Sequence, residues 1–204
     1  MNALLSTTYF GPVQWYQKLY RADSVLIERC ESFQKQTYRN RCLIATTQGI
    51  QALTVPVERS VPRTSYLVPR ISDIRISDHG QWRHLHWNAL QSAYGESPFF
   101  EFYEDDLRPF FEPHWEFLLD YNEAIRRKMC ELIDIQPRVG YTTEFTRSAA
   151  DDFRDAIQPK HPAPDPDFAP RPYYQVYRQT HGFLPNLSIL DLLMNMGPES
   201  IFYL

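Results

Sequence analysis

Short apolar runs alternate with amphipathic stretches at the start of the chain. Residues 3–9 form an apolar run that predicts a buried strand, and Pro12 suits the first turn of a helix. Residues 13–22 then carry apolar side chains at helical spacing, and residues 25–27 form a second apolar run. A strand, a short helix and another strand in this order predict a βαβ unit, with parallel strands and a right-handed crossover.

Further along the chain, the same patterns predict more strands and then mostly helices. Strands are expected at the apolar end of residues 31–44 and over 50–57, 71–76 and 139–145, helices over 82–94, 114–133 and 187–196, and a short turn or helix over 104–111. We therefore predict an α/β fold with a mostly parallel sheet, flanking helices and a helical C-terminal half. A mixed sheet of the α+β class is the alternative.

Length and composition favour one folded unit. A chain of 204 residues fits a single domain over 1–204, and domains of this size bury roughly 70% of their unfolded surface. Hydrophobic residues make up 43% of the chain and aromatic residues 15%, which argues against disorder. Residues 159–172 contain six prolines and predict a loop without regular structure, too short for an interdomain linker.

Several classes of protein are disfavoured by what the sequence lacks. No window approaches the ~18 consecutive apolar residues of a membrane span, and no signal-peptide pattern precedes the first strand. Cys30, Cys42 and Cys130 are too widely spaced for a metal or redox motif, so reduced thiols in the cytoplasm are expected. No P-loop, GxGxxG fingerprint, GxSxG elbow or HExxH motif is present, and no motif identifies a cofactor.

Charge is divided unevenly along the chain. Residues 1–87 hold 11 Lys and Arg against 6 Asp and Glu, whereas residues 88–204 hold 10 against 19. A basic half within an acidic protein favours a local anion site. Nucleic-acid binding is not expected, because the whole chain has a pI of about 5.9.

The segment 34–41 is the strongest candidate for that anion site. Lys35, Arg39 and Arg41 stand among amide and hydroxyl side chains, including Asn40. Because a guanidinium group offers paired donors that match phosphate or carboxylate oxygens, the segment suits a nucleotide or pyrophosphate. The alternative is a solvated loop that docks on the acidic half of the chain.

Two further positions are candidates for ligand contact. Gln14 opens the first helix, near the carboxyl end of the first strand, where α/β proteins bind ligands. His86 is a candidate acid–base residue or a hydrogen-bonded structural histidine. His84 and His86 would diverge on a helix, so a metal site is not expected. The acidic run that contains Glu101 and Glu104 to Asp106 is more typical of a solvated face.

Several segments together resemble the WbqC-like family of bacterial proteins, and the resemblance runs over nearly the whole chain. The segments are residues 6–10 with Pro12 and Gln14, residues 34–41, residues 53–57, His86 with Ala93 and Tyr94, residues 98–100, and Phe183 with residues 187–193, Asn195 and Gly197. Longer family members have a further α/β stretch, in place of which this chain has the Pro-rich loop 159–172.

The resemblance implies a role in surface polysaccharide assembly, such as that of O-antigen. A transferase that acts on a nucleotide-linked amino sugar, or on another anionic small molecule, is the function expected. The predicted substrate-binding residues are Gln14, Lys35, Arg39, Asn40, Arg41 and Tyr94, and His86 is the predicted catalytic residue. The alternative is a non-catalytic binding or assembly protein of a glycan biosynthesis complex, with an exposed partner surface at residues 173–177.

The opening of the chain is also similar to that of nucleotidylyltransferases, which begin with a strand, a Gly-Pro turn and a helix. Those enzymes carry a His-x-x-His motif just after the proline. Here Gln14 and Gln17 stand at these positions. Because glutamine does not act as a general acid or base, the similarity favours a shared fold rather than nucleotidyl transfer.

Overall fold

The predicted βαβ unit begins the fold. The computed structural model describes residues 1–58, 69–113 and 115–204. Strand β1 (Asn2–Leu5), helix α1 (Val13–Arg21) and strand β2 (Ser24–Ile27) follow one another, and β1 pairs with β2 in parallel. Strand β1 ends four residues earlier than the apolar run predicted.

Two short strands from the second half of the chain complete the sheet. Strand β5 (Val139–Tyr141) pairs in parallel with β2, and strand β6 (Asp151–Asp152) pairs in parallel with β1. The order β5-β2-β1-β6 confirms the predicted parallel sheet. Strand β5 lies within the strand predicted at residues 139–145. The two acidic residues of β6 gave no apolar pattern that could predict a strand.

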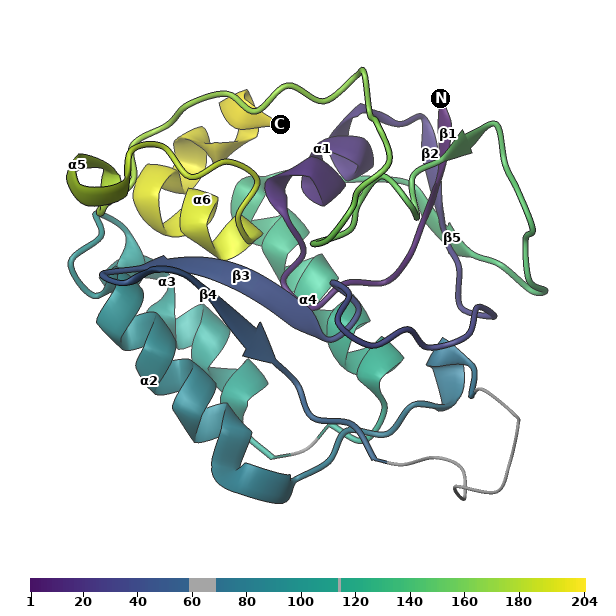
Figure 1. The fold of residues 1–204 in the computed structure, drawn as a ribbon, viewed down its shortest axis with the longest axis horizontal. Helices are drawn as coiled ribbons and strands as arrows, with labels where there is room; N and C mark the ends of the chain where they lie inside the picture. The colour runs from purple at the N-terminus through teal and green to yellow at the C-terminus, as the bar shows by residue number, and fades with distance from the viewer. Residues whose placement is uncertain (59–68, 114) are drawn as a thin grey trace.

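Strands β3 (Arg41–Thr46) and β4 (Gly49–Thr54) form a separate antiparallel hairpin. Figure 1 shows this hairpin below α6 and above α2. The predicted strand at 71–76 is wrong, because Ile71–Asp73 is a 3-10 turn. Beyond that turn, Arg75 and Ile76 make only isolated bridges, to Phe117 and Val57.

The helices lie mostly where the apolar spacing predicted them. They are α2 (Trp82–Tyr94), α3 (Phe100–Leu107), α4 (Leu118–Ile133), α5 (Arg178–His181) and α6 (Ile189–Met196), and 3-10 turns cover His79–Gln81, Arg108–Phe111 and Gly197–Tyr203. In the part of the chain that the structure describes, no helix is both long enough and apolar enough to cross a membrane.

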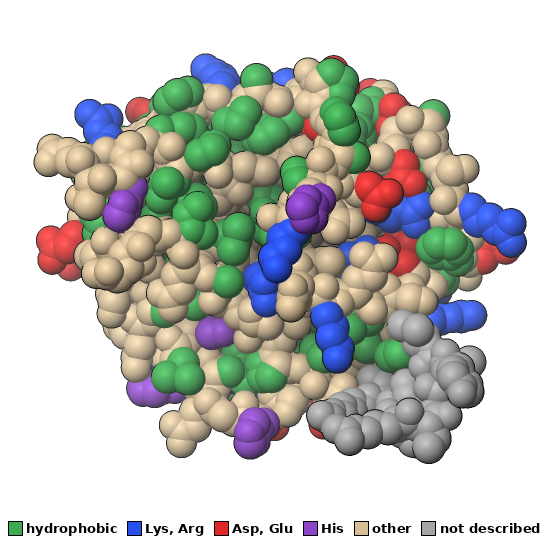
Figure 2. Space-filling model, viewed as in Figure 1, with side chains coloured by type: hydrophobic (Ala, Val, Ile, Leu, Met, Phe, Trp, Pro, Cys, Tyr) green, Lys and Arg blue, Asp and Glu red, His purple; other side chains and the backbone are tan. Residues whose placement is uncertain are grey.

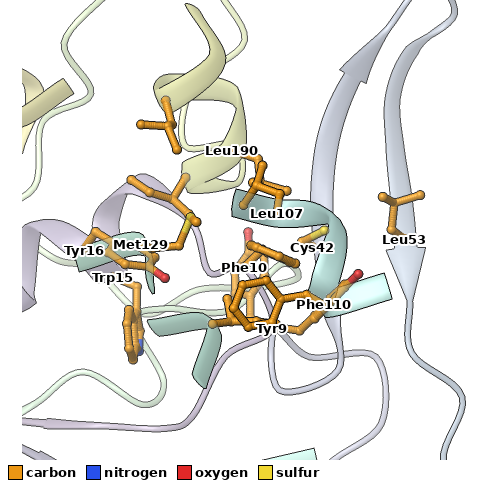
Figure 3. Packing of buried hydrophobic residues seen from close by; sticks show 14 of the residues in the cluster. Tyr9, Phe10, Trp15, Tyr16, Cys42, Leu53, Leu107, Phe110, Met129 and Leu190 are labelled. Atoms are coloured by element: carbon orange, nitrogen blue, oxygen red, sulfur yellow. The ribbon is translucent and has the colours of Figure 1, made fainter. Parts of the chain in front are cut away.

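An aromatic cluster joins the end of β1 to the helices. Phe10 is fully buried and packs edge-on against Phe110 at a centroid distance of 6.3 Å (Figure 3). It also stacks on Phe111 at 6.1 Å. It adopts a φ of 40°, which is unfavourable for a bulky residue and persists only where packing fixes it. Tyr9 stacks on Tyr121 at 5.8 Å. These contacts fix the chain as it leaves the carboxyl end of β1.

Two segments near the C-terminus bear on the predictions. Residues 159–172 contain no helix or strand, as expected, and Figure 1 shows this part of the chain passing over α1. Residues 173–177 form the predicted exposed surface only in part. Tyr174 is 43% exposed, whereas Tyr173 and Gln175 are buried and both donate hydrogen bonds to the carboxylate of Asp191 on α6.

Candidate anion-binding site

A polar pocket of about 530 Å³ lies where three parallel strands end. Its walls come from the segments that follow β2 and β5, from β6 with the residues after it, and from the basic segment 34–41. The lining residues are Cys30, Glu31, Ser32, Gln34, Arg39, Arg70, Phe145, Arg147, Asp152, Arg154 and Asp155. We call it the arginine pocket. Parallel sheets bind ligands at this edge, beside the strand at which the connections reverse direction.

Arg39 is held in place by two parallel hydrogen bonds to Glu31. Its Nε lies 2.8 Å from Oε1 and its Nη2 lies 2.7 Å from Oε2. Nη2 also donates to Ser6 Oγ, directly after β1. Both charged side chains are at most 6% exposed. A paired geometry of this kind fixes the guanidinium plane, and no described residue accepts a hydrogen bond from its Nη1.

Arg154 is fixed in a similar way in the same pocket. Its Nε and Nη2 donate to the two carboxylate oxygens of Asp152, at 2.9 and 2.6 Å. Burial opposes ionisation of Asp152, but the hydrogen bonds and charge of Arg154 outweigh it and hold the pKa of this carboxyl below its ordinary value. The fully buried Glu28 lies 3.9 Å from Arg154 and accepts from Thr142.

The rim of the pocket carries two exposed cations. Arg70 and Arg147 are solvent-exposed, and neither forms an ion pair with a described residue. The lining holds four arginines against three carboxylates, a net charge of +1. Figure 2 shows charged side chains of both signs gathered on the side of the molecule where Figure 1 places the sheet. The arrangement can bind an oxyanion between two fixed and two adjustable guanidinium groups.

A second, much smaller cavity shares the two fixed arginines. It has a volume of about 10 Å³, room for roughly one water molecule. Thr7 and Thr8, which follow β1, line it together with Arg39 and Arg154. The buried hydroxyls of both threonines have no hydrogen-bond partner among the described residues. Polar atoms in this state cost stability unless a water or ligand atom satisfies them.

The structure brings only one of the predicted site residues into the arginine pocket. Arg39 lines it, whereas Lys35 is exposed on the same segment and is not among the lining residues. Asn40 is buried and donates to the carbonyl of Val55. Arg41 begins β3, and its Nε donates to Thr54 on β4. Residues 35–40 form turns and bends, so side chains that are neighbours in sequence leave this segment in different directions.

Gln14 and Tyr94 serve other contacts. The Gln14 amide lies on α1 and hydrogen-bonds to Asp165 and to Asn186. Tyr94 is buried on α2 and donates to Asp191 at 2.9 Å. Neither side chain lines the arginine pocket.

His86 is buried in the aromatic core. Its Nδ1 lies 2.9 Å from Tyr9 Oη, and its ring packs edge-on against Trp82 at 5.1 Å. Burial lowers its pKa to about 4, because a charged imidazole is poorly solvated there. The ring is therefore neutral at pH 7 and does not line the pocket. Among the described residues, no group of His, Cys, Asp and Glu could hold a metal ion.

Sequence reasoning missed most of the pocket. Arg70, Arg147 and Arg154 come from distant segments and belong to no motif. Glu31 and Asp152 carried no signal either, because their role depends on a guanidinium group that folding brings near. Only the basic segment 34–41 gave a usable signal, through Arg39.

Fold and pocket together define an α/β protein with a cationic pocket at the carboxyl edge of a parallel sheet. The chain belongs to the WbqC-like protein family, whose model it matches over residues 7–158 and 166–203. It is 25% identical over 228 residues to the uncharacterized protein Rv1507c of Mycobacterium tuberculosis, an alignment that covers 99% of this chain and 96% of that protein. No solved structure is significantly similar.

Proposed function

We propose that this protein is a transferase that binds a nucleotide-linked amino sugar, or another anionic small molecule, in the arginine pocket and serves surface polysaccharide biosynthesis. The observation that carries the proposal is the set of four arginines around a 530 Å³ cavity at the carboxyl edge of the sheet. That volume lies within the range of small-molecule sites. The polysaccharide context rests on the family resemblance.

The pocket chemistry suits a phosphate-bearing substrate. The fixed groups of Arg39 and Arg154 would orient the phosphates, and Arg70 and Arg147 would close over them from the rim. An acceptor amine must lose a proton before or during transfer. Asp155 is an exposed carboxylate within the lining and takes the acid–base role that was predicted for His86.

A thermal-shift panel of nucleotides, nucleotide sugars, sugar phosphates and coenzyme A species tests the proposal. A ligand at ~100 times its Kd adds about 2.7 kcal/mol of stability, which raises Tm by roughly 5–10 °C for a domain of this size. Arg147→Ala should abolish most of the shift without unfolding the protein, since Arg147 is exposed. Arg138→Ala, at another exposed arginine, is the matched control.

The absence of a Tm shift with every ligand of the panel in the unmodified protein would count against a small-molecule site.

The alternative function, a non-catalytic assembly protein, is favoured by a different feature. A groove of about 710 Å³ runs between β4 and α2, and none of its lining residues is Lys, Arg, Asp or Glu. Ile50 is 53% exposed on β4 at this groove. A defined partner that co-purifies with the unmodified protein but not with Ile50→Glu would support this alternative function.

A further inference from the structure

Lys18 on α1 is buried to an unusual degree for a lysine. Its side chain is 1% exposed, and its Nζ lies 2.8 Å from Oδ2 and 2.9 Å from Oδ1 of Asp165, whose side chain is 4% exposed. Nζ also lies 4.4 Å from the centre of the Phe153 ring. An ammonium group is rarely buried without a partner, so this one depends on the carboxylate that reaches it.

A second donor completes a receptor for a carboxylate. Gln14 lies one helical turn before Lys18, and its Nε2 donates to Oδ2 of Asp165 at 2.8 Å. The Oε1 of Gln14 accepts from Asn186 at 3.0 Å, which orients the amide so that its NH₂ group faces the carboxylate. One cation and one oriented amide thus hold the two oxygens.

The carboxylate of Asp165 belongs to a segment that makes few other contacts with the rest of the protein. Residues 160–167 are exposed except for Asp165. The family match stops at residue 158 and resumes at 166, so Asp165 lies outside it. Gln14, Lys18 and Asn186 lie within the matched ranges. The residues that hold the carboxylate therefore lie in the part of the chain that matches the family, whereas Asp165 lies outside it.

We infer that Gln14, Lys18 and Asn186 form a second ligand site, which takes the carboxylate of a small molecule and which Asp165 occupies in this conformation. None of the three residues lines the arginine pocket, so the site is separate from the proposed phosphate site. Displacement of Asp165 admits the ligand carboxylate to the same two donors, Lys18 and Gln14, with Asn186 holding the Gln14 amide in place. Phe153, which lies against Lys18 and also lines the 10 Å³ cavity, would bound the ligand on the side of the sheet.

An acetate titration of Asp165→Ala tests the site directly. The Tm is measured in increasing sodium acetate, with sodium chloride replaced mole for mole to hold ionic strength constant. We expect the variant to melt below the unmodified protein and acetate to raise its Tm by a few degrees once acetate exceeds Kd tenfold. The unmodified protein should not respond, because Asp165 is a tethered competitor at high effective concentration.

Lys18→Met in the Asp165→Ala background removes the cation and should abolish the acetate response. A flat titration of folded Asp165→Ala would overturn the inference, and so would an equal rise in the Lys18→Met background. A response to phosphate but not to acetate would show that the ligand class is wrong. If Asp165→Ala does not fold, Asp165→Ser retains a hydroxyl acceptor for Lys18 and is titrated in the same way. None of these results depends on the arginine pocket.

Discussion

At the scale of single residues, the candidate pocket is built from charges that are fixed before any ligand arrives. Arg39 and Glu31 are both almost fully buried and make two direct hydrogen bonds. Such a pair contributes little net stability over apolar residues, but the loss of one partner leaves a buried charge without compensation. The pair therefore serves to hold the guanidinium group in a defined place.

We expect Arg39→Met to lower the free energy of unfolding by about 3–5 kcal/mol, because Glu31 is left unpaired in the interior. The double variant Arg39→Met with Glu31→Gln removes both charges and should recover a large part of that loss. Urea denaturation measures both. Equal losses in the single and double variants would show that the two side chains do not act as a pair.

His86 predicts a specific dependence of stability on pH. Its folded pKa of about 4 lies below its ordinary value of 6.5, so between these values the unfolded chain binds the proton more readily. The histidine's contribution to stability is thus lost as the pH falls from about 6.5 to 4, by roughly 3 kcal/mol in total. Urea denaturation across this range should give a flatter profile for His86→Gln than for the unmodified protein. His84→Gln, at an exposed position, is the control.

At the scale of elements, α6 is held against the rest of the protein by hydrogen bonds as well as by its apolar face. Asp191 accepts hydrogen bonds from Tyr94 on α2 and from Tyr173 and Gln175 in the segment that precedes α6. Ser188 caps the helix by accepting from the Leu190 amide, and its hydroxyl donates to the carbonyl of Phe10. One residue thereby ties α6 to the segment between β1 and α1.

Ser188→Ala should lower the free energy of unfolding by about 1–2 kcal/mol, since it removes the cap and leaves the Phe10 carbonyl without this donor. Thermal denaturation should show a decrease in Tm of several degrees. Ser148→Ala changes an exposed serine and should have almost no effect. Equal Tm values for the two variants would contradict the capping role.

At the scale of the whole molecule, the sheet depends on both halves of the chain. Strand β1 lies between β2, which follows it directly, and β6, which comes almost 150 residues later. Cooperative folding is therefore expected to need residues far apart in sequence. The arginine pocket forms only when these segments meet, because its lining extends from Cys30 to Asp155.

A fragment of residues 1–138 should not unfold cooperatively, because it lacks β5, β6 and α6 and exposes apolar surface that these elements cover. Circular dichroism during heating measures this, with the full chain as the reference. A sharp transition in the fragment near the Tm of the full chain would show that the N-terminal part folds independently.

The sequence by itself determined the local elements and the family. Apolar spacing fixed α2 at residues 82–94 and predicted the parallel pairing of β1 and β2, because periodicity records which face of an element is buried. It did not predict β6, whose two aspartates become a strand through hydrogen bonds to β1. Tertiary structure alone decided the site: it buried His86 and brought Arg154 into the same pocket as Arg39. Side chains from distant segments form one site only through tertiary contacts, and local sequence patterns do not encode these contacts.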